Sequence, residues 1–389
     1  MSAFAALTRI RQGLAQLEAD ALLRKRLLLE SPQGVRVRVN GHDVLSFCSN
    51  DYLGLANEPQ LLEAAQDAMR QSGLGAGASH LLTGHHRHHA ELESGFAALV
   101  GKSDALLFSS GYMANLGVLT ALLNRHGEVF ADRLNHASLN DAAQLCGAKF
   151  SRYVHGALDQ LDGLLGRSQA RDKVIVSDLV FSMDGDVADV DALLRLAERH
   201  DAWLYLDDAH GFGVLNDGRG GLTEAARNSD RVIYLATLGK AAGVSGAAVA
   251  AHADVIQWLV QKARTHVYTT ATPPMLAAAA RKSLDLIAAG QHRRDRLRQH
   301  VITLRQLLAD LPCWKLLASG TPIQPLLIGS NAEAVKMSQK LLERGLLVPA
   351  IRTPTVPVGT ARLRISLSAA HTEDDVATLI RALRELAGV

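Results

Sequence analysis

The sequence predicts an α/β fold: a mostly parallel central sheet covered by helices, followed by a smaller α+β domain. From about residue 58 to 285, apolar strand-like runs alternate with helical stretches. These runs are continuously apolar, as expected of parallel strands that are buried on both faces. Past Pro273-Pro274, strands and helices are fewer and mixed. We therefore expect three parts: an N-terminal helix and hairpin segment at 1–45, a large α/β domain at 46–288 and a small C-terminal α+β domain at 289–389.

The N-terminal segment predicts a helix followed by a hairpin. Apolar side chains recur at spacings of three and four between Leu7 and Leu22, which favours an amphipathic helix over residues 4–29. Alternating valines then lead to Asn40-Gly41, a dipeptide typical of two-residue hairpin turns. Residues 44–48 follow as the expected second strand.

In the rest of the chain, apolar runs predict strands and periodic stretches predict helices. The uncharged stretch 105–124 is long enough to span a bilayer, but its Ser, Gly, Asn and Thr residues favour strand, turn and buried helix. In the large domain we expect strands at 105–108, 128–131, 174–177, 203–206 and 232–235, and helices at 60–69, 136–146 and 190–200. In the small domain we expect a long helical region at 275–311, strands at 324–328 and 362–367, and helices at 332–344 and 372–386.

Composition excludes several classes of protein. Among 389 residues, 41 Lys and Arg balance 39 Asp and Glu, and aromatic residues make up 4%. This composition supports neither a basic surface nor a stacking platform, so we expect no nucleic-acid partner. The three cysteines have neither metal-ligand nor redox spacing, and the first residues lack the pattern of a signal peptide. We therefore expect a cytoplasmic protein with no membrane association.

Two strand ends carry residues that suggest chemistry. One expected strand leads to Asp207 and, three residues on, His210. A carboxylate buried there needs a cationic partner, although a solvated loop is the alternative. The next strand leads to Thr237 and then to Lys240, whose neighbours are small and apolar. Desolvation favours the neutral amine, which is the form of lysine that adds to an aldehyde.

A neutral lysine and an acid that faces a cation together suggest pyridoxal 5'-phosphate as the cofactor. Asp207 would keep the pyridine nitrogen protonated, so that the ring accepts electrons. The cofactor also needs a phosphate site. The segment from Ser109 to Tyr112 lies where a strand turns into a helix, and such a turn offers free backbone N–H groups.

Several motifs together resemble the α-oxoamine synthases, and the resemblance covers nearly the whole chain, from 50–55 to 362–367. The motifs are Ser110-Gly111-Tyr112, Phe181-Ser182-Met183-Asp184-Gly185-Asp186, Asp207-Asp208-Ala209-His210 and Thr237-Leu238-Gly239-Lys240. Members of this family are fold-type I pyridoxal-phosphate enzymes with active sites at a dimer interface. They condense an amino acid with an acyl thioester and release CO2. The resemblance implies that fold, that cofactor, a homodimer and that reaction.

The resemblance also implies a role for each cofactor residue. Lys240 would hold the cofactor covalently and then act as the base that moves the α-proton. Asp207 would hold the pyridine N–H, and His136 would stack on the ring and line the substrate site. The phenolic oxygen would be contacted by Ser182 and His210, and the phosphate by Gly111, Tyr112 and Thr237, with Thr269 or Thr270 reaching a phosphate in the neighbouring subunit.

The stretch 350–364 most resembles members that join L-alanine to a pimeloyl thioester, carried by coenzyme A or by acyl carrier protein. By this resemblance Arg352 would clamp the alanine carboxylate, with a surface arginine as the alternative, and Thr355 would contact the acyl substrate. Arg24 or Arg26 would line the acyl site, and Arg24 is favoured. The alternative activity is that of glycine C-acetyltransferase, which uses glycine and acetyl-CoA. A catalytically silent protein of this fold would be expected to have lost the lysine or the acid.

A histidine-rich stretch at 85–89 looks like a metal site at first sight. His85 and His89 share a face if a helix has already begun there. The stretch itself contains no carboxylate or cysteine that would complete a set of ligands, and Arg87 in its middle would repel a cation. We therefore expect no metal, and a histidine of this loop facing the active site is the favoured alternative.

Overall fold

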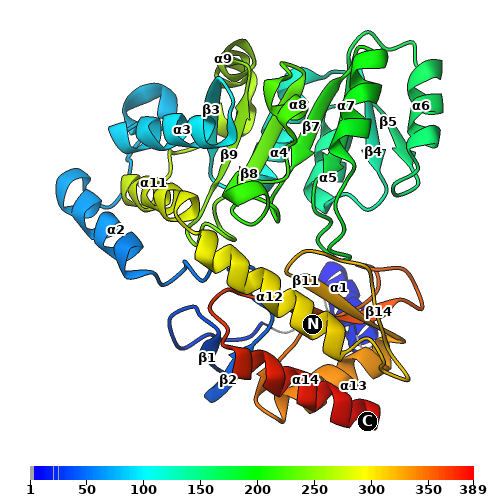
Figure 1. Ribbon diagram of the computed structural model, residues 1–389. Coiled ribbons are helices and arrows are strands. Elements are labelled where there is room, and N and C mark those ends of the chain that lie inside the picture. The colour runs from blue at the N-terminus through cyan, green and yellow to red at the C-terminus, as the bar shows by residue number, and fades with distance from the viewer. Residues whose placement is uncertain (1–3, 21, 25) are drawn as a thin grey trace. The chain divides into compact units, whose positions relative to one another are not determined.

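The protein is described here by a computed structural model, which covers residues 4–20, 22–24 and 26–389 (Figure 1). The chain divides into two compact units. The large unit comprises Asn50–Leu297, and the small unit comprises Met1–Ser49 together with Arg298–Val389.

A seven-stranded sheet forms the centre of the large unit (Figure 1). Its strand order is β3-β9-β8-β7-β6-β4-β5, and β8, β7, β6, β4 and β5 run parallel to one another. Strand β9 is antiparallel to both of its neighbours. The mostly parallel sheet is therefore confirmed. The strands are β3 (Asp104–Phe108), β4 (Glu128–Asp132), β5 (Lys149–Tyr153), β6 (Lys173–Asp178), β7 (Trp203–Asp207), β8 (Val232–Thr237) and β9 (Ala247–Ala251).

Helices pack against both faces of this sheet (Figure 1). All the strands and helices expected here between 60 and 235 are present, with small shifts at their ends. The helices of the large unit are α2 (Pro59–Ser72), α3 (Arg87–Val100), α4 (Gly111–Leu122), α5 (Ala137–Leu145), α6 (Leu158–Arg167), α7 (Val190–Arg199), α8 (Glu224–Asn228), α9 (Ala253–Lys262), α10 (Arg264–Val267) and α11 (Pro274–Ala288), with short η1 (His80–Gly84) and η2 (Asn216–Gly218) segments.

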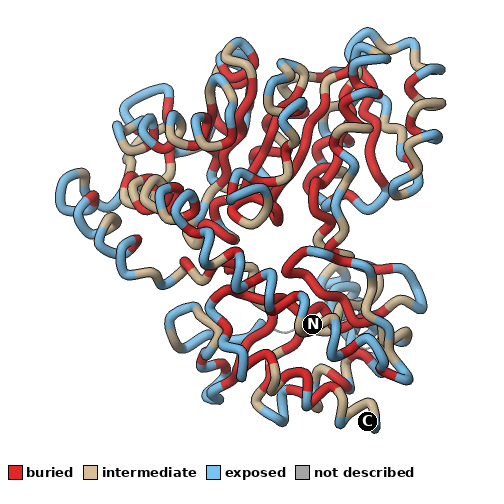
Figure 2. The backbone as a smooth tube through the Cα atoms, in the orientation of Figure 1, coloured by how far each residue is buried: buried red, intermediate tan, exposed pale blue. Residues whose placement is uncertain are grey.

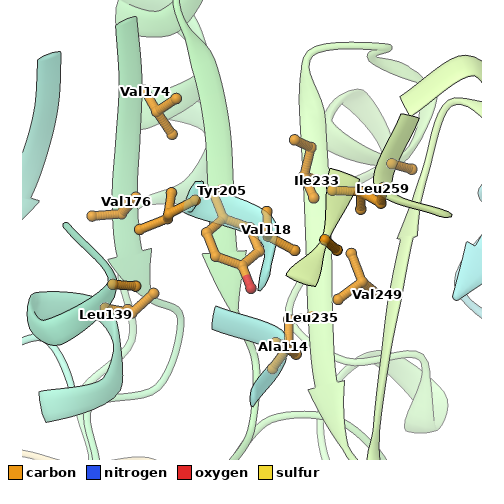
Figure 3. Packing of buried hydrophobic residues seen from close by; sticks show 14 of the residues in the cluster. Ala114, Val118, Leu139, Val174, Val176, Tyr205, Ile233, Leu235, Val249 and Leu259 are labelled. Carbon is orange, nitrogen blue, oxygen red and sulfur yellow. The ribbon is translucent and has the colours of Figure 1, made fainter. Parts of the chain in front are cut away.

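The core of the large unit lies between the sheet and the helices α4, α5 and α9 (Figure 3). Val118 of α4 and Leu139 of α5 pack with Val176, Tyr205 and Leu235 of the strands, and all five are fully buried. Figure 2 shows the same pattern along the backbone, because the strands are buried and the outer helices alternate between buried and exposed turns. The uncharged stretch 105–124 thus forms β3, a turn and buried helix α4, as expected.

The small unit contains two small sheets and the helices around them. One sheet has the order β1-β2-β12 and the other has the order β10-β11-β14-β13. Helix α12 (Gln291–Leu307) begins in the large unit and ends in the small one. The strands are β1 (Arg36–Val39), β2 (His42–Ser46), β10 (Lys315–Leu316), β11 (Ile323–Gly329), β12 (Leu346–Leu347), β13 (Ala350–Ile351) and β14 (Ala361–Ser366), and the other helices are α1 (Ala5–Ala19), α13 (Asn331–Leu342) and α14 (Glu373–Ala387).

The N-terminal hairpin is part of the small unit rather than a separate segment at 1–45. Its turn at Asn40-Gly41 has φ values of 48° and 80°, as a two-residue hairpin turn requires. Strand β2 pairs in parallel with β12, and the Nε2 atom of His371 lies 3.0 Å from the carbonyl oxygen of Ser46. These contacts between distant parts of the sequence explain why the expected division differs from the observed one. The large unit ends at Leu297 rather than near 288.

Two helices are shorter than the sequence predicts. Helix α1 ends at Ala19, not at 29, because the chain at 28–30 bonds instead to the hairpin: the Asn40 N–H donates to the Leu28 carbonyl at 3.0 Å. The region 275–311 is two helices, α11 and α12, separated at Gly290. A Cβ atom at Gly290 would lie 2.7 Å from the Leu286 carbonyl oxygen, so this break suits glycine. Within the described residues, every helix is too short or too polar to cross a membrane.

Candidate active site

The predicted cofactor residues of the large unit follow the carboxyl ends of four neighbouring strands. His136 follows β4, Ser182 follows β6, Asp207 ends β7, and Thr237 ends β8 just before Lys240. Because parallel strands end at one edge of a sheet, these residues gather there. Ligands of open α/β sheets bind at this edge.

Asp207 is buried and firmly held. Its side chain is 3% exposed, its Oδ2 atom accepts a hydrogen bond from Asn115 Nδ2 at 2.8 Å, and its Oδ1 atom accepts from the Ala209 N–H at 3.0 Å. On the neighbouring strand, Asp178 is paired with Asp207 in the sheet register. Burial and, next, the negative charge of Asp207 raise the pKa of Asp178 well above its usual value. Asp207 is therefore a fixed acceptor at the sheet edge.

A buried polar network joins Asp207 to His136, and sequence analysis missed it. Asn115 Nδ2 also donates to Ser138 Oγ at 2.8 Å, and Ser138 Oγ lies 2.7 Å from His136 Nδ1. Tyr205 donates its hydroxyl hydrogen to Asn115 Oδ1 at 2.6 Å. Asn115 thus fixes both the acid and, through the serine, the imidazole. The sequence signal that could have pointed to Asn115 is its position four residues after Gly111, which puts both residues on the same face of α4.

His136 is also positioned through its backbone. Its N–H donates to Asp178 Oδ2 at 2.5 Å. Desolvation lowers the pKa of His136, while Asp207 acts in the opposite direction and Lys240 adds to the lowering. The imidazole is consequently favoured in its neutral form, which suits a ring that stacks on an aromatic cofactor.

Lys240 takes part in a chain of hydrogen bonds. Its Nζ atom lies 2.9 Å from His210 Nε2, and His210 Nδ1 lies 2.7 Å from the Tyr52 hydroxyl. Lys240 is half-buried, whereas His210 and Tyr52 are buried. The Tyr52 hydroxyl donates to Asn50 Oδ1 at 3.1 Å, so its oxygen accepts from the His210 Nδ1–H, and His210 Nε2 accepts from Lys240 Nζ. The chain therefore fixes the His210 tautomer and places its Nε2 atom against the Lys240 amine.

Tyr52→Phe is expected to move the acid limb of the pH–rate profile to lower pH. The variant removes the oxygen that accepts from the His210 Nδ1–H and stabilises the protonated ring, and a hydrogen bond of about 0.5–1.5 kcal/mol corresponds to a shift of up to roughly one pH unit. Tyr153→Phe, which also removes a buried hydroxyl, is the control. An unchanged profile in Tyr52→Phe, with only lower stability, would show that Tyr52 is merely structural.

The phosphate residues predicted around α4 also come together. Ser110 caps α4 by accepting from the Met113 N–H at 3.2 Å, so the helix begins at Gly111. A Cβ atom on Gly111 would lie 2.7 Å from Thr237 Cγ2, which shows how closely the two segments approach. Tyr112 is 41% exposed, and its hydroxyl donates to Asp141.

Two other predicted groups occupy loops of the large unit. Ser182 lies in a tight turn after β6, in which the Gly185 N–H donates to the Phe181 carbonyl at 2.8 Å. Thr269 and Thr270 lie between α10 and α11, and Thr270 forms an isolated bridge with Ser79. A role at the cofactor remains a prediction for these residues.

His155 ties the Ser182 loop to the end of β4. Its Nδ1 atom lies 3.0 Å from Asp132 Oδ2, and its Nε2 atom lies 2.8 Å from Asp186 Oδ2. Hydrogen bonds to Asp132 and then Asp186 raise the pKa of His155 to about 10. The imidazole is therefore positively charged at neutral pH and bridges two loops that lead to predicted site residues.

His155→Gln is expected to lower the melting temperature at neutral pH and to have less effect in alkali. The folded-state pKa is raised above the unfolded value, so the stabilisation is fully present below about pH 6.5 and is lost as pH rises towards about 10. Thermal unfolding of both proteins across this range measures the gap in Tm. A gap that stays constant would contradict a charged His155.

The predicted substrate residues lie in the small unit and line one groove. Arg24, Arg352 and Thr355 border a groove of about 760 Å³, together with Leu14 and Leu17 of α1. Arg26 does not border it, which favours Arg24 as the arginine of this set. The turn after Arg352 is closed by the Thr355 N–H, which donates to the Arg352 carbonyl at 3.0 Å.

The sequence is similar to those of known enzymes over nearly its whole length. Residues 42–383 match the family model of the class I and II aminotransferases. Over 98% of its length, the chain is 66% identical to the 8-amino-7-oxononanoate synthase of Thiobacillus denitrificans, of which 99% is covered. It is 57% identical over 97% of its length to the enzyme of the same name from Nitrosomonas eutropha, of which 98% is covered. It belongs to the 8-amino-7-oxononanoate synthase family.

Solved structures agree with this membership. The chain resembles the 8-amino-7-oxononanoate synthase of Francisella tularensis with a TM-score of 0.75 and 30% identity, over 89% of this chain and 98% of that one. It resembles Sphingomonas wittichii serine palmitoyltransferase with a TM-score of 0.91 and 28% identity, over 98% and 96%. A further SPT structure, with a PLP internal aldimine, gives a TM-score of 0.92 at 26% identity over all of both chains. The fold-type I architecture implied by the sequence is confirmed.

Proposed function

We propose that this chain is a pyridoxal-phosphate-dependent acyltransferase that condenses L-alanine with a pimeloyl thioester. The products are 8-amino-7-oxononanoate, CO2 and a free thiol, and the reaction belongs to biotin biosynthesis. The acyl group would arrive on coenzyme A or on acyl carrier protein. The observation that carries this proposal is the 66% identity to a relative of that name over 98% of the chain.

The residues at the sheet edge fit the cofactor. Asp207 is a buried, firmly held acceptor for a pyridine N–H, and the Lys240 amine lies at the same edge. The close approach of Thr237 to Gly111 at the start of α4 offers a hydroxyl and free backbone N–H groups for a phosphate. When bound, the cofactor supplies a ring that withdraws electrons from the substrate's α-carbon.

The protein's own residues would then handle the proton and orient the substrate. Lys240 would take the α-proton on Nζ and later return it, with His210 as its hydrogen-bond partner. His136 would present the flat face of its imidazole, held by Ser138. Ser182 and His210 would bind the phenolic oxygen of the cofactor.

The groove in the small unit fits the two substrates by its chemistry. Arg352 would bind the alanine carboxylate through two parallel hydrogen bonds, a geometry that lysine cannot copy. Leu14 and Leu17 offer an apolar wall for a chain of methylene groups, and Arg24 would line the acyl site. Thr355 would contact the acyl substrate. The proposal thus assigns a role to each predicted residue that borders the groove.

Assembly and location complete the proposal. We expect a homodimer in which Thr269 or Thr270 would reach the phosphate in the neighbouring subunit, and we expect the protein in the cytoplasm. Light scattering of the purified protein tests the first point, because a monomer at micromolar concentration would contradict the homodimer.

A comparison of substrate pairs tests the activity itself. Steady-state rates are measured with L-alanine and pimeloyl-CoA, with L-alanine and pimeloyl-acyl carrier protein, and with glycine and acetyl-CoA. We expect kcat/KM for either pimeloyl pair to exceed that for the acetyl pair. A preference for glycine with acetyl-CoA would instead support a glycine C-acetyltransferase, and inactivity with all three pairs would support a silent protein of this fold.

A further inference from the structure

Three histidines outside the candidate active site converge in the large unit. His80 begins η1, His85 follows that segment, and His89 lies in the first turn of α3. Each offers one ligand nitrogen, and the three nitrogens all lie within 4.8 Å of one another. The ring centroids are 5.3 Å apart for His80 and His85, 5.0 Å for His80 and His89, and 5.7 Å for His85 and His89.

The ring centroids have the spacing of a tetrahedral metal site, and the ligand nitrogens, within 4.8 Å of one another, would close around an ion by small side-chain rotations. With Zn–N bonds of about 2.0–2.1 Å, imidazoles at tetrahedral angles place their ring centroids roughly 5 Å apart. The shortest contact of the cluster joins His80 Nδ1 and His85 Nδ1 at 3.0 Å. Two imidazole nitrogens this close share one hydrogen, and a cation between them would take its place.

A fourth histidine, outside the set of three, packs against the cluster. His266 stacks on His80 with a centroid distance of 4.7 Å and helps to enclose the cluster.

One of the three rings already has a hydrogen-bonded outer partner, and a second has a carboxylate nearby. His89 Nε2 lies 2.8 Å from the carbonyl oxygen of Thr272, and His85 Nε2 lies 3.7 Å from Glu93 Oε2. Carbonyl and carboxylate groups are the usual partners of the second nitrogen of metal-bound histidines. In both rings Nδ1 is then the nitrogen that would bind a metal, and in His89 this atom now accepts from the His86 N–H.

The two sequence-based objections to a metal do not hold in the folded protein. Arg87 donates from its Nη2 atom to Gln71 Oε1 at 2.6 Å, so its charge is directed towards α2. The third ligand that the stretch 85–89 lacks is His80, which the fold brings to His85 and His89, while Glu93, one turn beyond His89 on α3, lies behind His85. Metal binding costs the hydrogen bond from the His86 N–H to His89 Nδ1, now 2.9 Å long. His86 is only half-buried, so water can replace that partner.

We propose that His80, His85 and His89 bind one divalent metal ion, with Zn²⁺ as the best-suited ion. Three imidazoles without thiolates suit zinc and its neighbours rather than Mg²⁺ or Ca²⁺, which prefer oxygen ligands. The ion would fasten η1 to the start of α3. This inference does not depend on the proposed acyltransferase activity.

Metal titration of untagged, cofactor-loaded protein tests the site. After dialysis against a chelator, Zn²⁺ is added in a calorimeter, and Co²⁺ is added while absorbance is followed at wavelengths beyond the cofactor band. We expect one ion per chain, Co²⁺ bands of tetrahedral intensity, and a higher Tm with Zn²⁺. No saturable binding, or Co²⁺ bands of thiolate ligation, would overturn the proposal.

Variants locate the ion. His85→Ala is expected to abolish the tetrahedral Co²⁺ bands, and Glu93→Gln to weaken binding by ~10–100-fold as loss of an outer partner does. His88→Ala, a neighbouring histidine outside the set, is the matched control and should bind as the wild type does. Bound-cofactor absorbance verifies folding, and His85→Gln replaces any His85→Ala protein that fails to fold. Equal binding by the wild type and the His85 variant would refute the site.

Discussion

Lys240→Ala is expected to abolish turnover and to remove the visible absorbance of covalently bound cofactor. The variant removes the amine that would hold the cofactor and carry the α-proton, so we expect a rate loss on the order of 10⁴-fold or more. Rate measurements and a visible spectrum of the purified variant test this. The fold should persist, because Lys240 is half-buried and its removal empties no apolar core.

A surface lysine provides the control for this experiment. Lys262 lies at the end of α9, is exposed, and contacts the Trp258 ring at 5.3 Å from its centroid. Lys262→Ala should keep both the activity and the spectrum. An active, yellow Lys240→Ala protein would contradict the assignment of the covalent lysine.

Asp207→Asn is expected to lower kcat by about 10²–10⁴-fold while the protein still binds the cofactor. The change keeps the size of the side chain but removes the charge that would hold a proton on the pyridine nitrogen. The carboxamide oxygen can still accept from Asn115 Nδ2, which now donates to Asp207 Oδ2 at 2.8 Å, but the amide NH2 cannot accept from the Ala209 N–H. A lower rate with intact folding would therefore report the charge together with the loss of one backbone hydrogen bond.

Asp201→Asn is the matched control for the acid. Asp201 is exposed, and its ion pair with Arg231 lies at 2.8 Å on the surface, where it is worth little. Its backbone has φ 49°, a conformation that asparagine tolerates well. Full activity in Asp207→Asn, equal to that of Asp201→Asn, would contradict a pyridine-binding role for Asp207.

Much of the fold could be predicted from sequence because the strands are encoded by residues that are adjacent in the chain. Strands such as β6 and β8 are continuous apolar runs, and the hairpin turn at Asn40-Gly41 is encoded by two adjacent residues. The end of helix α1 could not be predicted because it depends on the hydrogen bond from the Asn40 N–H to the Leu28 carbonyl, which local periodicity does not reveal. The strand pairing between β2 and β12 is non-local in the same way.

In the candidate site, too, local sequence patterns predict some residues, and contacts between distant residues determine the others. The placement of Asp207 and Lys240 at the sheet edge could be predicted because Asp207 ends one apolar strand and Lys240 lies three residues after another. Tyr52 could not, since it contacts His210 from 158 positions away in the sequence. Asn115 was missed because a buried asparagine in an apolar helix gives no sign of its distant partner at Asp207. Glu93 was overlooked because its proximity to His85 depends on where α3 begins.

Borohydride reduction of the cofactor-loaded protein, followed by peptide mapping, tests the central claim most directly. Reduction makes the link between cofactor and amine permanent, so the labelled peptide identifies the residue. We expect the label on Lys240, which follows β8 and lies 2.9 Å from His210. A label on another lysine, or the recovery of unlabelled protein, would contradict the account.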